Sequence, residues 1–337
     1  MSTTTPAYEA LASTWTRLHH LQHLQSIAGW DHAANMPPKG NEARAAALAE
    51  MAALLHRMRT DPALTDHLAR AEQEALDDMQ RANLREMQRQ WRLSNVLPES
   101  LVQRQSIAAS RCEHAWREQR PANDWAGFVG KLQEVLALAR EEAALLSAQT
   151  GLRPYDALMD RFEPGMTSER LDGIFGEVRQ WLPGLIRRVI EKQAKEALIT
   201  PAGPFPQDRQ RALCEQVIGL LGFDFQAGRL DVSTHPFCGG VPEDVRITTR
   251  FRDDEFLTSL MGTIHETGHG RYEQNLPRAL LGQPVAQARS MALHESQSLS
   301  FEMQLGGHPG FVARLAPLVV QAFGEQPAFT PANLHRL

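Results

Sequence analysis

The 337-residue sequence predicts a mainly helical fold with a small antiparallel sheet. Long amphipathic segments joined by short connections containing proline or glycine occupy most of the chain, and such segments are typical of helices packed on one another. Strand-like patterns, rich in β-branched residues, are confined to residues 223–251. A helix carrying histidine and glutamate side chains follows over residues 253–277, so the sheet is expected beside this helix.

The N-terminal part divides into helices at turns and capping residues. Residues 7–28 form one expected helix with Trp15 on its apolar face, and a turn at residues 36–40 separates it from an alanine-rich helix over 41–58. Proline favours the first helical turn, and Asp or Thr caps the free N–H groups there. On this basis, further helices begin near Pro62, Pro98, Asp124 and Thr167.

Two short strands are expected in the C-terminal part, over residues 230–233 and 245–249. Turns are expected at Gly228 and at the pair Gly239 and Gly240, where the strand pattern is interrupted.

The length of the chain allows a large core in one or two domains. We expect an N-terminal helical region over residues 1–200 that lines a cleft. Residues 201–337 are expected to carry the strands and the functional helices, within one continuous catalytic domain.

Composition and charge argue against several classes of protein. The net charge is −5 and both signs of charge are mixed along the chain, so no basic footprint indicates nucleic acid or an anionic membrane as a partner. No segment reaches the roughly 18 consecutive apolar residues of a membrane-spanning helix. The three cysteines are widely spaced, which argues against a disulfide framework or a cysteine metal cluster. These observations favour a cytoplasmic protein.

The helix over residues 253–277 contains the strongest chemical motif, His-Glu-Thr-Gly-His at residues 265–269. One helical turn separates His265 from His269, so both imidazoles project from the same face, ~6 Å apart, as two ligands of one metal ion must. Glu266 lies one step round the helix, where a carboxylate can take a proton from a water molecule. The pattern indicates Zn²⁺-dependent hydrolysis. In the alternative interpretation, both histidines are merely polar residues on a partly buried helix.

A third protein ligand is expected in the next helix, because a catalytic zinc ion has three protein ligands and one open position. Residues 291–298 contain His294 and Glu295, and either residue type binds zinc. Adjacent helical side chains point about 100° apart, so only one of the two can face the metal. The residues alone leave this choice open.

His19 and His23 are also four residues apart on an expected helix. His20 lies between them and no acidic or histidine partner follows at a useful distance, so we interpret them as a solvated face rather than a metal site.

The stretches HETGHGRYEQNLP and ARSMALHESQS resemble the thermostable carboxypeptidase (carboxypeptidase Taq, M32-type) family of zinc metallopeptidases. The resemblance implies that His265, His269 and Glu295 bind the metal and that Glu266 is the general base. It also implies a metallocarboxypeptidase acting on peptides, with zinc or alternatively cobalt as cofactor, and a homodimer.

Two further stretches look like signature motifs of the same family, His235-Pro236-Phe237 and the segment at residues 244–248. Carried over, they place His235, Asp244 and Arg246 around the cleft as substrate-binding residues. In the alternative interpretation, Asp244 and Arg246 simply pair and His235 caps a turn.

The resemblance extends over residues 8–337, but the family's later Ile-Arg and Gln-Asp-x-His-Trp signatures are not found, so the chain is expected to lack a C-terminal part. Two other functions stay open at this stage. One is an aminopeptidase or endopeptidase with the same zinc ligands, and the other is a catalytically inactive helical interaction protein.

Overall fold

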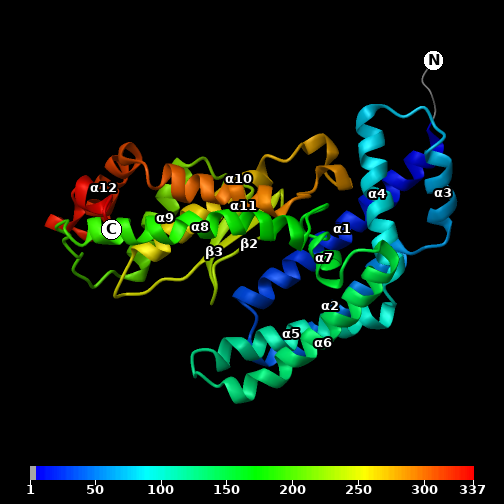
Figure 1. The fold of residues 1–337 in the computed structure, drawn as a ribbon, viewed down its shortest axis with the longest axis horizontal. Helices are drawn as coiled ribbons and strands as arrows, with labels where there is room; N and C mark the ends of the chain where they lie inside the picture. The colour runs from blue at the N-terminus through cyan, green and yellow to red at the C-terminus, as the bar shows by residue number, and fades with distance from the viewer. Residues whose placement is uncertain (1–4) are drawn as a thin grey trace. The chain divides into compact units, whose positions relative to one another are not determined.

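A computed structural model describes residues 5–337 and contains thirteen α-helices within that range (Figure 1). The mainly helical fold class is confirmed. None of the helices in residues 5–337 combines the length and the apolar character needed to cross a bilayer. The chain forms two compact units, described separately below. The division expected at residue 200 stays a prediction.

Unit 1 comprises Met1–Leu158, Gly239–Val241 and Asn275–Ala288. Its helices are α1 (Pro6–Ala34), α2 (Asn41–Arg59), α3 (Ala63–Ala71), α4 (Asp78–Val96), α5 (Glu99–Gln119) and α6 (Trp125–Thr150). Leu11 and Trp15 of α1 pack with Leu55, Leu68 and Met87 in one buried cluster, so the apolar face expected on the first helix is the face that is buried.

The helix starts predicted at Asp124 and Thr167 agree with the observed caps, whereas the first helix extends beyond its expected end at residue 28 to Ala34. The Asp124 side chain accepts a hydrogen bond from the Gly127 backbone N–H at 2.9 Å and starts α6. The same helix ends at Gly151, whose φ of 73° is the left-handed conformation that glycine adopts without steric cost. Thr167 caps α8 in the same manner as Asp124, by accepting from the Arg170 N–H.

Unit 2 comprises Met159–Cys238, Pro242–Gln274 and Arg289–Leu337. Its helices are α8 (Ser168–Gln193), α9 (Gln207–Leu220), α10 (Leu257–Gln274), α11 (Met291–Leu299), a π-helical turn η4 (Ser300–Leu305), α12 (Pro309–Phe323) and α13 (Pro331–Leu334). Ile264 of α10 belongs to its buried core, together with Val217, Ile247, Phe256 and Leu315. The functional helix is therefore anchored in the core of unit 2.

Short helical elements complete the chain. They are α7 (Pro154–Met159) and the 3₁₀ helices η1 (Pro38–Gly40), η2 (Arg278–Leu280), η3 (Pro284–Ala286) and η5 (Pro327–Phe329).

The sheet has three strands, β1 (Gly228–Val232), β2 (Cys238–Val241) and β3 (Asp244–Thr249), in the order β1-β3-β2. β1 and β3 pair in parallel, so the sheet is mixed and the expectation of a wholly antiparallel sheet needs correction. After β1 the chain continues to β2, which lies on the other side of β3. It then turns back into β3, so β1 and β3 run in the same direction. β2 was interpreted as a turn, because glycine has a low strand propensity.

Gly268 allows α10 and α11 to approach each other closely. A Cβ atom at Gly268 would lie 2.6 Å from the Ser298 Cα and 2.7 Å from the Gln297 carbonyl oxygen, both backbone atoms that cannot rotate away. At Gly262, earlier in α10, a Cβ atom would meet nothing within 4 Å. Only the first glycine is therefore required by packing.

We predict that Gly268→Ala destabilises the fold by about 1–3 kcal/mol, the usual cost of inserting a methyl group into a packed contact. The matched variant Gly262→Ala is expected to stabilise it by roughly 1 kcal/mol, because alanine is the better helix former. Urea unfolding followed by circular dichroism measures both effects. Equal stability changes in the two variants would contradict the close contact.

Candidate metal centre

α10 presents three of the predicted functional side chains. The His265 and His269 rings have their centroids 5.0 Å apart at an interplanar angle of 80°, as expected for side chains one helical turn apart. The side chains are 21% and 13% exposed, respectively, so both are largely shielded while an edge remains accessible. Glu266 is buried, with 7% of its surface exposed.

α11 brings Glu295 to the two imidazoles. Its carboxylate oxygens lie 3.7 Å from His265 Nε2 and 3.4 Å from His269 Nε2. One ligand atom from each of the three residues lies within 4.8 Å of the others. Two ligands at 2.0–2.2 Å from a tetrahedral zinc ion are about 3.4 Å apart, so the spacing fits such an ion. Half of the Glu295 side chain is exposed, which leaves an approach from solvent.

His294 does not belong to this group of ligand atoms. Its Nδ1 lies 2.6 Å from His269 Nδ1, and its Nε2 lies 2.8 Å from Glu273 Oε1. Both ring nitrogens are thus occupied by protein atoms, which leaves Glu295 as the residue of α11 that faces His265 and His269.

Two carboxylates that the sequence did not single out contact histidines of this centre, Glu302 at His265 and Glu273 at His294. Glu302 Oε2 lies 2.8 Å from His265 Nδ1, and Glu273 contacts His294 as described above. The spacing of these two glutamates in the sequence could have identified them. Glu302 is seven residues after Glu295, and Glu273 is four residues after His269. Both intervals return to nearly the same face of a helix. Glu302 lies in the π-helical turn η4, and such turns are frequent at functional sites.

Glu163 holds the start of α11 in place. Its carboxylate accepts hydrogen bonds from the Ser290 hydroxyl at 2.7 Å and from the Ala292 backbone N–H at 2.9 Å, and these bonds lower the pKa of Glu163. Ser290 in turn accepts from the Leu293 N–H at 3.0 Å as the cap of α11. The turn around Glu163 therefore positions the helix that carries Glu295.

Burial changes the protonation of two side chains in the centre. It raises the pKa of Glu266 to about 7, because the surroundings disfavour the charged carboxylate. Burial, reinforced by the neighbouring His294 and His265, lowers the pKa of His269 to about 4. His269 is therefore a neutral imidazole at neutral pH, which is the form that binds metal ions.

The three predicted substrate-binding residues lie on or next to the strands. Arg246 of β3 forms a two-pronged ion pair with Asp244, at 2.9 and 2.7 Å. His235 lies between β1 and β2, with Nδ1 2.8 Å from the Pro236 carbonyl oxygen. None of the three belongs to the group of metal-ligand atoms found among residues 5–337. Their role in substrate binding stays a prediction.

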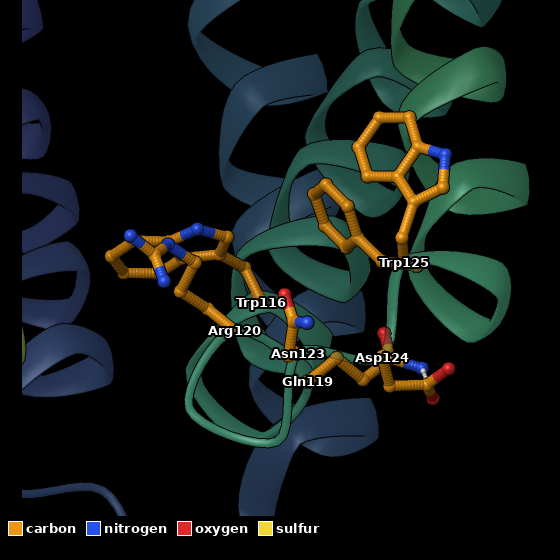
Figure 2. A pocket seen from close by; sticks show the side chains of 7 residues that line it. Trp116, Gln119, Arg120, Asn123, Asp124 and Trp125 are labelled. Atoms are coloured by element: carbon orange, nitrogen blue, oxygen red, sulfur yellow. Dashed lines mark hydrogen bonds between the residues drawn. The ribbon is translucent and has the colours of Figure 1, made fainter.

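Within the described residues, unit 1 contributes no side chain to a group of possible metal ligands. His19 and His23 lie in α1, and neither belongs to the group found in residues 5–337. Figure 2 shows a hollow at the α5–α6 turn, with Trp116 and Arg120 on one side and Trp125 on the other. The carboxylate in its lining, Asp124, serves as the cap of α6, so the hollow presents no comparable cluster of ligands.

Comparison with known proteins relates nearly the whole chain to one family. The family described as "Carboxypeptidase Taq (M32) metallopeptidase" matches residues 10–335. Thermostable carboxypeptidase 1 of Thermus thermophilus is 36% identical over 95% of this chain, and carboxypeptidase 1 of Bacillus subtilis is 32% identical over 88%. The chain spans 65% and 59% of the lengths of these two relatives.

Among solved structures, metallocarboxypeptidase 1 of Trypanosoma cruzi superposes with a TM-score of 0.89 at 47% identity, over 99% of this chain and 68% of the other. The M32 carboxypeptidase of Deinococcus radiodurans gives a TM-score of 0.85 at 32% identity, over 98% and 66%. With the histidine pair on α10 and the family match over nearly all its residues, the chain belongs to the carboxypeptidase Taq (M32) metallopeptidase family.

Proposed function

We propose that this protein is a zinc-dependent metallocarboxypeptidase that releases C-terminal residues from peptides. The observation that carries the proposal is the group formed by His265, His269 and Glu295, whose spacing and donor types suit one divalent ion. The relatives named as carboxypeptidases support the reaction type. Nitrogen and carboxylate donors in a site with an open side favour zinc, with cobalt as the alternative.

When bound, a divalent ion at this centre supplies Lewis-acid polarisation of the scissile carbonyl and of the attacking water. The Glu266 carboxylate is proposed to accept a proton from that water and to deliver it to the departing amine. A pKa of about 7 suits both steps, since the group can accept and release a proton at neutral pH. Glu266 is one step round α10 from His265, which places it beside the centre and leaves the ligand positions to the other three residues.

Substrate recognition is assigned to the region of β3. We propose that His235, Asp244 and Arg246 border the bound peptide, and that the Asp244–Arg246 ion pair fixes the guanidinium in one orientation. A peptide next to a strand can also bind by main-chain hydrogen bonds. A cytoplasmic location and a homodimer remain predictions from the sequence and its resemblance.

The first prediction separates metal binding from catalysis. Replacing His265, His269 or Glu295 by alanine should strongly lower the metal content, because each removes one of three ligands. Glu266→Gln should keep the metal and lose hydrolysis by about 10²–10⁴-fold, because only the proton acceptor is removed. Metal analysis of the purified variants and a peptide assay measure the two effects.

The double variant His19→Ala, His23→Ala is the matched control, because it removes an equally spaced histidine pair from α1. It should change neither metal content nor hydrolysis. Full metal occupancy in Glu295→Ala would rule out the proposed ligand set.

The second prediction concerns which end of the peptide is recognised. A peptide with a blocked N-terminus and a free carboxylate should lose its last residue. The same peptide with a C-terminal amide should react about ten- to a hundredfold more slowly in kcat/KM, because one charge-assisted hydrogen bond contributes roughly 1.5–3 kcal/mol.

Product analysis by mass spectrometry distinguishes the other functions. Release of the first residue from peptides with a free N-terminus would indicate an aminopeptidase, and internal cleavage of doubly blocked peptides an endopeptidase. Absence of any cleavage by metal-loaded protein would favour an inactive interaction protein.

A further inference from the structure

We propose that Glu302 and the pair His294–Glu273 are positioning residues that fix both metal-binding histidines in the tautomer with a free Nε2 lone pair. The inference takes its ligand assignment from the proposed function. It concerns which atom donates the hydrogen in each contact of these histidines. It assigns roles to three residues that are neither proposed metal ligands nor the proposed proton acceptor.

One contact determines the tautomer of His265. A neutral imidazole has one N–H donor and one acceptor nitrogen, and an ionised carboxylate only accepts. Glu302 Oε2 lies 2.8 Å from His265 Nδ1, so Nδ1 must carry the hydrogen and donate it. The lone pair is then on Nε2, the nitrogen that lies 3.7 Å from Glu295.

Two contacts in series determine the tautomer of His269. Glu273 Oε1 lies 2.8 Å from His294 Nε2, so that nitrogen carries the hydrogen and donates it. If the His294 ring carries this one hydrogen only, its acceptor is Nδ1, which lies 2.6 Å from His269 Nδ1. His269 must donate from Nδ1, and its lone pair is on Nε2, 3.4 Å from Glu295.

Both chains of hydrogen bonds thus end in the same state, with a lone pair on the Nε2 atom of each of the two histidines. Glu302 contacts His265 directly, whereas Glu273 acts on His269 through the imidazole of His294. The His294 ring is itself held between His269, with ring centroids 4.7 Å apart, and Tyr272, at 4.8 Å. Partners of this kind set ligand orientation and basicity, and their loss typically costs 10–100-fold in metal affinity.

Glu273 provides the sharpest test, because its recorded contact is with His294 and not with a metal ligand. In Glu273→Gln the amide NH₂ can donate to His294 Nε2, which would move the His294 hydrogen to Nδ1. His294 would then donate to His269 Nδ1, and His269 would carry its hydrogen on Nε2, where it blocks metal binding. Glu302→Gln tests the direct contact in the same way.

The measurements are the Zn²⁺ dissociation constant of the full chain, by competition with a chromophoric chelator, and the histidine tautomers of metal-free protein, by ¹⁵N NMR. Glu302→Gln and Glu273→Gln should each weaken zinc binding about 10–100-fold. Glu215→Gln is the matched control, since it removes the same charge from unit 2 at a residue of α9 paired with Arg211. It should change the constant less than twofold.

The tautomers report the proposed role in a way that a general loss of structure would not. In the wild-type chain both His265 and His269 should be protonated on Nδ1, and in Glu273→Gln only His269 should shift to Nε2–H. Wild-type zinc affinity together with an Nδ1–H His269 in Glu273→Leu, whose side chain can neither accept nor donate a hydrogen bond, would overturn the relay.

Failure of this inference and failure of the proposed function would give different experimental results. A wild-type chain that binds no zinc would refute the metal centre, yet the tautomers of metal-free protein would still decide this inference. Nε2–H on His265 or His269 in the wild-type chain would contradict it, even if the enzyme is an active carboxypeptidase.

Discussion

The backbone contact between α10 and α11 at Gly268 is the constraint on which the centre depends. Glu295 is a medium-length side chain, and it reaches both His265 and His269 only if its helix lies directly against α10. A side chain at Gly268 would collide with the backbone of Gln297 and Ser298, at 2.7 and 2.6 Å. The same glycine that weakens α10 as an isolated helix therefore lets Glu295, the proposed third ligand, approach the two histidines.

The rest of unit 2 supports this contact from both sides. Ile264 anchors α10 in the apolar core, while Glu163 fixes the start of α11 through Ser290 and Ala292. Beyond α11, the π-helical turn carries Glu302 to His265 Nδ1. The geometry of the proposed ligands thus depends on packing as well as on residue type, and loosening either helix should weaken metal binding before it affects the overall fold.

The sequence was most informative where the signal is local. Residues four apart on one helix predict the His265–His269 pair from periodicity alone, and Asp124 and Thr167 predict helix starts from capping chemistry. Choosing between His294 and Glu295 required the orientation of α11, which no local pattern contains. The contact from Glu163 to Ser290 spans 127 residues, and the parallel pairing of β1 with β3 depends on the path of the chain between them. Both depend on tertiary structure.

The chemistry assigned to this protein needs a neutral imidazole at each ligand position and a carboxyl that exchanges its proton near neutral pH. At His269 and Glu266 burial has these two effects, because the same low-polarity surroundings that keep His269 neutral raise the pKa of Glu266 to about 7. One environment therefore favours metal binding and proton transfer together.

X-ray absorption at the zinc edge on the zinc-loaded chain tests the central claim most directly, because it counts the ligands of the ion itself. The account predicts a first coordination sphere of light atoms at about 2.0–2.2 Å, with multiple scattering from two imidazoles and the remaining ligands oxygen. A sphere with three imidazoles would place His294 on the metal and contradict the account, and a sphere with one or none would contradict it equally.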